Sequence, residues 1–194
     1  MRIGLACNSW NQPEGLARLL ESCKEFDRKM VIDGRYYERK DGPEYSGYED
    51  ICKKYDAELY HKSNCTDYEK RNLYFEQASD LDCLIIIDDD ELLTKWNRKT
   101  FEESLEARKT HDRFAYNVNF WENNTLYEIP RVFTNPTKCY YKDRHNMVWS
   151  GNMEVLGRMI GPRIDGIELK HDKDFRESFR EANNRLYRQA HAFE

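Results

Sequence analysis

Residues 83–91 read Cys-Leu-Ile-Ile-Ile-Asp-Asp-Asp-Glu, an apolar run followed directly by four acids. The run predicts a strand over residues 82–88 that is apolar on both faces, as in a buried parallel sheet. Alternate residues of a strand point to the same side, so we expect Asp88 and Asp90 to present their carboxylates together. Asp89 and Glu91 are expected to face elsewhere.

Strands and helices alternate over the first half of the chain. The first helix has Asn11 as its predicted N-cap, Pro13 in its first turn and Glu14 in position for a capping box. Strands are expected at residues 2–7, 29–33 and 57–60, and helices at about residues 13–23, 48–55 and 67–79. This alternation predicts an α/β fold with a mostly parallel, doubly wound sheet flanked by helices.

The pattern changes after a helix expected at residues 97–110. Residues 114–120 alternate between apolar and polar side chains, as in a half-exposed strand. Further strands are expected at residues 126–133, 138–141 and 167–170, and an amphipathic helix closes the chain. We therefore divide one compact domain into a first half, residues 1–93, and a second half of α+β type, residues 94–194.

The composition narrows the classes of function. Thirty-one basic against 36 acidic residues give a net charge of −5, which argues against a broad footprint for nucleic acid. The apolar run at residues 84–87 is far shorter than the roughly 20 residues of a spanning helix, so we expect no membrane span and a cytoplasmic location. The six cysteines lack any CxxC spacing and are interpreted as reduced core thiols.

Acids at the end of a buried strand can bind a metal. Open parallel sheets hold ligands at the carboxyl ends of their strands, and Mg²⁺ or Mn²⁺ is typically bound by one or two carboxylates with substrate phosphate oxygens. The alternative is a solvated strand end or an acidic cap for the next helix. Consecutive acids repel one another unless a cation compensates them, and this cost favours a functional role.

Four segments, taken in order, resemble a known family. They are residues 3–13 (Ile-Gly-Leu-Ala-Cys-Asn-Ser-Trp-Asn-Gln-Pro), 31–34 (Val-Ile-Asp-Gly), 70–72 (Lys-Arg-Asn) and 84–91. In this order and spacing the chain resembles the family 2 glycosyltransferases, which share the GT-A fold. The resemblance implies a hexosyltransferase that uses Mn²⁺ or Mg²⁺, with a donor-binding first half and an acceptor-binding second half.

The resemblance also implies roles for residues of the first half. Asp88-x-Asp90 corresponds to the metal motif. Asp33 fits a contact to the nucleoside or, equally, a turn residue before Gly34. The segment 70–72 suits a pyrophosphate or the acid cluster, with a solvated helix face as the alternative. The nucleotide-binding residues implied are Asn8, Ser9, Asp33, Arg71, Asp88 and Asp89.

The second half lacks the usual base motif of the best-known members. Residues 130–133, 140–145 and 169–171 resemble instead a lipopolysaccharide-core-type branch of the family. His171 follows a late strand and is interpreted as a further metal ligand, and a surface imidazole is the alternative for it and for His145. The acids from which a catalytic base could be drawn are Asp143, Glu128 and Glu154.

The sequence therefore predicts transfer of a sugar from a uridine or guanosine diphosphate sugar to a hydroxyl group. The acceptor is a glycan, a lipid-linked molecule or a small molecule. Aromatic residues of the second half, such as Trp121 and Tyr127, suit a sugar acceptor or a packed core. One alternative is a metal-dependent nucleotidyl or phosphoryl transferase, although neither a Gly-rich phosphate loop nor a second acid pair is present. Another is a non-catalytic binder of nucleotide sugars or glycans.

Overall fold

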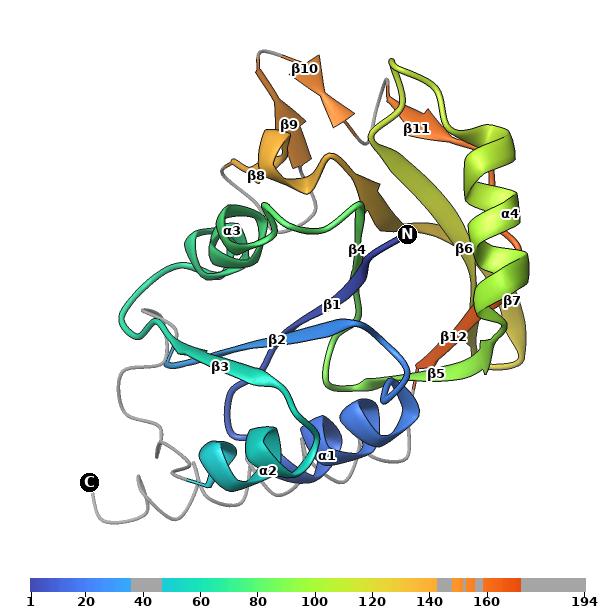
Figure 1. Cartoon of the computed structure of the whole chain (residues 1–194). Helices are drawn as coiled ribbons and strands as arrows, with labels where there is room; N and C mark the ends of the chain where they lie inside the picture. The colour runs from blue at the N-terminus through green and yellow to red at the C-terminus, as the bar shows by residue number, and fades with distance from the viewer. Residues whose placement is uncertain (36–46, 143–147, 152, 156–158, 172–194) are drawn as a thin grey trace.

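The computed structural model describes residues 1–35, 47–142, 148–151, 153–155 and 159–171 (Figure 1). The expected C-terminal helix, Asp143 and His145 lie outside these residues. The helices are α1 (Pro13–Ser22), α2 (Tyr48–Lys54), α3 (Asp67–Gln77) and α4 (Arg98–Arg108), with a 3-10 turn at Pro136–Lys138. The strands are β1 (Ile3–Asn8), β2 (Arg28–Asp33), β3 (Glu58–His61), β4 (Cys83–Ile86), β5 (Glu91–Trp96), β6 (Ala115–Glu122), β7 (Thr125–Thr134), β8 (Tyr140–Tyr141), β9 (Val148–Ser150), β10 (Met153–Glu154), β11 (Ile160–Gly161) and β12 (Ile167–His171).

The main sheet has the strand order β3-β2-β1-β4-β7-β6-β12-β5, and β11 pairs with β6. Strands β3, β2, β1 and β4 run parallel. Strand β7 lies antiparallel between β4 and β6, and β12 joins parallel to β6 and antiparallel to β5. Figure 1 shows how the sheet curls round from β3 to β5. The predicted α/β class with a mostly parallel sheet is confirmed.

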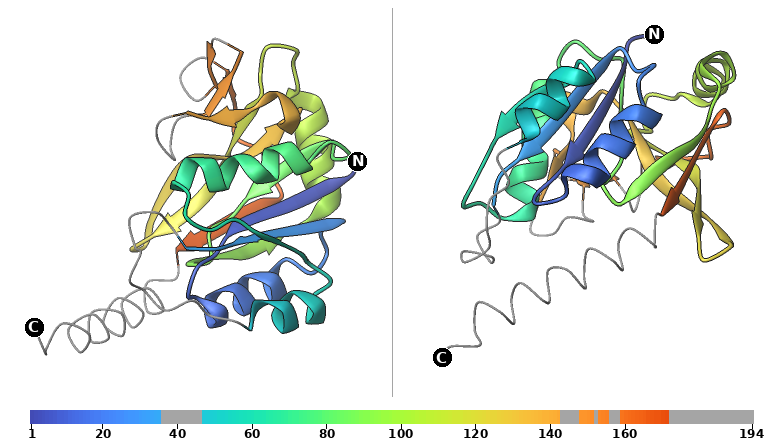
Figure 2. Two further views of the ribbon diagram at one scale, coloured as in Figure 1. Left: turned by 90° about the vertical axis from the view of Figure 1, so that its left-hand side faces the viewer. Right: turned by 90° about the horizontal axis from the view of Figure 1, so that it is seen from below.

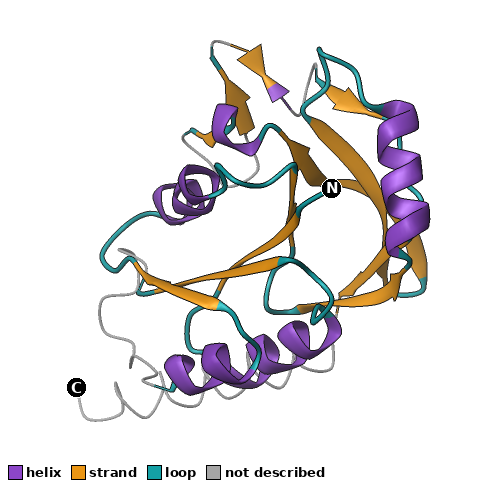
Figure 3. Ribbon diagram, viewed as in Figure 1, coloured by secondary structure: helices purple, strands orange, loops and turns teal. Residues whose placement is uncertain are grey.

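Two apolar cores cover the two faces of the parallel strands. Successive strand residues point to opposite faces, so Leu5 and Cys7 enter one core and Ala6 enters the other. The first core is closed by α1, α2 and α4, and the second by α3 with the small sheet β8–β10. Figure 2 shows α3 on the opposite side of the sheet from α1 and α2, and Figure 3 marks the helices in purple on the two sides of the strands.

Three local predictions were wrong. Gln12 rather than Asn11 is the N-cap of α1, and no side chain caps this helix. Asn11 has a φ of 55°, so it turns the chain before the helix begins. Strand β4 ends at Ile86, two residues before the predicted end. Residues 91–96, which begin with the last of the four acids, form β5, a strand that was not predicted and that spans the proposed division at residue 93.

The remaining general findings concern thiols and membranes. All six cysteines are free and buried, as predicted. Within the described ranges, no helix combines the length and apolar character needed to cross a bilayer.

Candidate functional site

The carboxyl ends of β1, β2 and β4 bring the predicted polar residues to one edge of the sheet. Because these three strands are parallel neighbours, the residues that follow them meet at this edge. The Ser9 hydroxyl lies 2.7 Å from a carboxylate oxygen of Asp89 and 3.0 Å from the hydroxyl of Tyr48. Tyr48 also accepts a hydrogen bond from the backbone of Gln12 at 2.8 Å, which fixes the loop between β1 and α1.

A buried lysine joins the first two loops of this edge. Lys70, on α3, is fully buried and donates to the backbone oxygens of Ser9 at 2.7 Å and Gly34 at 2.8 Å. Gly34 has a φ of +130°, and a Cβ there would lie 2.4 Å from the backbone oxygen of Lys62, so only glycine fits. Burial lowers the pKa of Lys70 to about 8, although Asp33 and another carboxylate oppose the shift. The solvated helix face considered for Lys70 is therefore wrong.

Asp88 lies between two arginines. Its carboxylate accepts from Arg71 at 2.9 Å and lies 3.4 Å from Arg131. Arg131 also pairs with Glu91, whose carboxylate accepts from the backbone N–H of Asp88 at 3.0 Å. Burial alone would raise the pKa of Asp88, but the two guanidinium groups outweigh it and lower that pKa. We call these four residues, Arg71, Asp88, Glu91 and Arg131, the guanidinium cluster.

A β-bulge puts Arg131 in place. In the β6–β7 pair, Tyr116 lies opposite Val132 and Asn117 opposite Pro130, so Arg131 is the extra residue of β7. A bulge re-aims a side chain that regular pairing would direct elsewhere. From the sequence, Arg131 stands out only within a family resemblance, because the spacing of apolar residues does not indicate the bulge.

Asp89 and Asn8 are buried polar groups at the same edge. Burial raises the pKa of Asp89 to about 8; the hydrogen bond from Ser9 opposes this shift, and the neighbouring carboxylates add to it. Asn8 is only 4% exposed, and neither polar atom of its side chain has a hydrogen-bond partner within the described part of the chain. A buried amide without partners is costly, and a ligand that pairs with it would remove this cost.

A second group forms where β12 meets the acids. His171 is in register with Glu91 of β5, and its ring is 7% exposed. The Nε2 atom lies 3.1 Å from a carboxylate oxygen of Asp90, and Nδ1 lies 3.2 Å from one of Glu122. We call Asp90, Glu122 and His171 the imidazole cluster. His171 therefore lies beside Asp90, and its predicted role as a metal ligand stays a prediction.

Glu122 was missed by the sequence analysis, although a signal existed. The alternation that turns Phe120 inward continues for one more step to Glu122, at the end of β6. The turn directly after Glu122 interrupts the alternation, so the pattern alone did not indicate that Glu122 faces inward. The ring of Phe120 lies 6.1 Å from that of His171, which shows that both face the same side of the sheet.

The other predicted residues have separate surroundings. Asp33 is 9% exposed and lies 3.4 Å from Nδ1 of His61. The side-chain amide of Asn72 donates to the backbone oxygen of Tyr141 and accepts from its backbone N–H, so it links α3 to β8. Glu128 is half exposed, pairs with Arg163 at 3.8 Å, and lies opposite Asn119, on the other face of the β6–β7 pair from Glu122. Glu154 belongs to β10.

The two carboxylates expected to act together have different partners. Asp88 faces Arg71 and Arg131, whereas Asp90 faces His171. The reason is that β4 ends before the acids, so the alternation of a strand does not hold there. No group of three or more His, Cys, Asp and Glu side chains in the described ranges is arranged to hold a metal.

No protein-family model and no curated protein matches the sequence. Among solved structures, that of S. aureus TarS matches with a TM-score of 0.60 and 12% identity, over 88% of this chain and 36% of that one. The structure of TarS 1–349 matches with a TM-score of 0.57 and 12% identity, over 88% of this chain and 60% of that one. TarS is a glycosyltransferase of the GT-A type. This chain has a GT-A-like fold. At 12% identity the likeness concerns the fold alone, and the chain spans less than two thirds of either structure.

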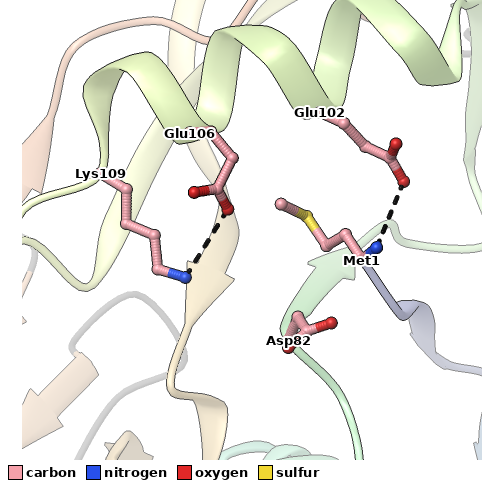
Figure 4. A pocket seen from close by; sticks show the side chains of 5 residues that line it. All are labelled: Met1, Asp82, Glu102, Glu106 and Lys109. Atoms are coloured by element: carbon pink, nitrogen blue, oxygen red, sulfur yellow. Dashed lines mark ion pairs between the residues drawn. The ribbon is translucent and has the colours of Figure 1, made fainter.

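A surface pocket lies at another edge of the GT-A-like fold. Its lining residues are Met1, which precedes β1, Asp82, which precedes β4, and residues of α4 and its C-cap, so it lies at the amino ends of these strands. Figure 4 shows the N-terminal amine of Met1 paired with Glu102, at 3.8 Å, and Lys109 paired with Glu106, at 3.9 Å. Neither the guanidinium cluster nor the imidazole cluster contributes to it.

Proposed function

We propose that the chain is a metal-dependent glycosyltransferase. It would transfer a hexosyl group from a uridine or guanosine diphosphate sugar to a hydroxyl group of a glycan, a lipid-linked molecule or a small molecule. One observation carries the proposal: in a GT-A-like fold, the acids after β4 meet a histidine delivered by β12 at the carboxyl edge of the sheet. Ligands of open α/β sheets bind at this edge.

The residues at this edge fit Mn²⁺ or Mg²⁺. Asp90 offers a carboxylate and His171 a ring nitrogen 3.1 Å from it, so both can reach one ion. Such ions need only one or two protein ligands when substrate phosphates supply more, and Mn²⁺ accepts imidazole. Asp88, predicted as a further ligand, would act instead through its arginine partners. When bound, the ion would neutralise charge that develops on the departing diphosphate.

The nucleoside would lie beside the ends of β1 and β2. Asp33 can accept hydrogen bonds from ribose hydroxyls or a base N–H, as an acid does in other doubly wound nucleotide sites. Asn8 contributes an amide whose donor and acceptor are both available to a ligand. Ser9 and Asp89 hold the loop in place through their hydrogen bond. Arg71 would position the acids rather than bind phosphate directly, because Asp67 and Asp88 already pair with it.

The acceptor side rests on the second half of the chain. A carboxylate would deprotonate the acceptor hydroxyl if the reaction inverts configuration. Asp143, Glu154 and Glu128 remain the candidates, and Glu128 has the weakest claim because it lies on the other face of the β6–β7 pair from the imidazole cluster. The resemblance to the lipopolysaccharide-core-type branch also stays a proposal.

Donor hydrolysis tests the proposal. We expect slow, Mn²⁺-dependent release of nucleoside diphosphate from a UDP-sugar or GDP-sugar, and its loss in Asp90→Asn. Asp112→Asn is the control, because the Asp112 side chain is 77% exposed and belongs to neither cluster. Release of nucleoside monophosphate would indicate a nucleotidyl or phosphoryl transferase. Binding without any release, detected as a rise in melting temperature, would indicate a non-catalytic binder.

A further inference from the structure

We propose that Glu122 is a positioning residue that holds the proton of His171 on Nδ1 and so leaves Nε2 open toward Asp90. The inference rests on the proposed function, because it gives His171 the role of a metal ligand. Glu122 lies outside the expected motif, and from the sequence it is recognised only as a residue before a turn.

The geometry places the imidazole between two competing acceptors. Glu122 lies 3.2 Å from Nδ1 and Asp90 lies 3.1 Å from Nε2. The ring is 7% exposed and packs near Phe120, so the surrounding strands hold its orientation. Glu91, the residue in register with His171 on β5, is engaged with Arg131.

The chemistry makes this competition decisive. A neutral imidazole carries one N–H and one lone pair. If the proton is on Nε2, it donates to Asp90, and this bond occupies both groups that would bind the ion. If the proton is on Nδ1, it donates to Glu122, and no N–H of the ring is then bonded to the Asp90 carboxylate. Carboxylates that fix a ligating histidine in this way are a general feature of metal sites.

The hairpin holds Glu122 in position. Glu122 is the last residue of β6 and pairs with Thr125, the first residue of β7. The two residues between them, Asn123 and Asn124, have φ values of 51° and 58°, as in the tight turns that match the twist of a hairpin. The carboxylate is therefore held at the end of β6, beside a short, regular turn.

The tautomer balance can be measured without any metal. We would record ¹⁵N chemical shifts of His171 in the metal-free protein, at a pH well above the imidazole range where the ring is neutral. Glu122→Ala should move the balance toward the Nε2–H form, and Asp90→Ala should move it toward Nδ1–H. Glu122→Gln should stay near the wild type, because its amide oxygen still accepts from Nδ1–H. The same balance in Glu122→Ala and the wild type would overturn the proposal.

Manganese affinity gives the second readout. With UDP present, Glu122→Ala should weaken Mn²⁺ binding by about 10-fold to 100-fold, the usual cost of losing such a partner, and Glu122→Gln should recover most of it. Glu168→Ala is the matched control, since Glu168 is an acid of the same strand as His171 that pairs with Lys95. In a His171→Ala background, Glu122→Ala should add nothing.

The two proposals fail in different ways. If His171→Ala binds Mn²⁺ as the wild type does, the metal role proposed for His171 is wrong, and the tautomer balance still decides the role of Glu122. If His171→Ala weakens binding and Glu122→Ala does not, the function stands and the positioning role of Glu122 is wrong.

Discussion

The guanidinium cluster and the imidazole cluster receive carboxylates from the same four-acid run, yet they balance charge differently. Asp88 and Glu91 face arginines, which stay protonated throughout the physiological range. Asp90 faces an imidazole, which can exchange its proton for a metal. The first cluster therefore holds the loop together, and the second is the part to which we assign the proposed ion. Adjacent acids of one motif need not share one task.

The largest effect should follow from removing the central cation of the guanidinium cluster. Arg131→Met would leave the buried Glu91 without its partner and Asp88 with one arginine, and breaking a buried pair typically costs about 3–5 kcal/mol. We expect a loss of about 3 kcal/mol or more in the free energy of unfolding, measured in urea. Arg131→Lys should recover part of it. Wild-type stability in Arg131→Met would mean that the cluster does not hold the loop.

A pH series tests whether the buried amine of Lys70 loses its proton more readily in the folded protein than in the unfolded chain. The folded-state pKa of Lys70 is about 8, below its unfolded value of about 10.4. Between these values the unfolded chain binds more protons, so the contribution of Lys70 to stability rises with pH. Relative to Lys70→Met, the wild type should gain at most about 3 kcal/mol from pH 8 to pH 10. If the difference in unfolding free energy between the wild type and Lys70→Met stays constant from pH 8 to pH 10, the inference that burial lowers the pKa of Lys70 is wrong.

The smallest changes in stability should come from Asp88→Asn and Asp90→Asn. Measured together with manganese binding, these two variants should distinguish the two clusters. Asp88→Asn removes a charge that two arginines compensate, and we expect about 1–2 kcal/mol of destabilisation. Asp90→Asn should change stability less than Asp88→Asn does, because an asparagine amide can still hydrogen-bond to Nε2 of His171, but it should abolish most Mn²⁺ binding. Urea unfolding and manganese titration of both variants give the comparison. Equal results for the two variants in both assays would mean that the acids act as one unit.

Local patterns were enough to predict the first half of the fold. Strands β1, β2 and β4 are short apolar runs, and α1 carries its apolar residues on one face, so each element is visible in its own residues. Asp88 and Asp90 could be expected at this edge because they lie within four residues of the end of β4, and His171 because it ends β12. Strand β5 could not be recognised from its own residues, because it pairs with β12, which lies far along the chain.

The partners of the predicted residues were harder to predict. Arg131 reaches the acids through a bulge, and a bulge depends on the pairing of two strands rather than on the composition of one. Glu122 reaches His171 only because β6 and β12 are neighbours. The two carboxylates expected side by side have different partners, because β4 ends before the acids and its alternation does not extend to them.

The pairing of β5 with β12 also sets an order of events during synthesis. Asp90 and His171 are 81 residues apart, so about that length of chain must be made after the acids before the histidine can join them. Pairings between distant residues close large loops and form slowly. A nascent chain would assemble the edge formed by β1, β2 and β4 first and would acquire last the pair that we propose binds the metal. Arg71 and Lys70 precede the acids in the chain, so these cations would be present before His171 is made.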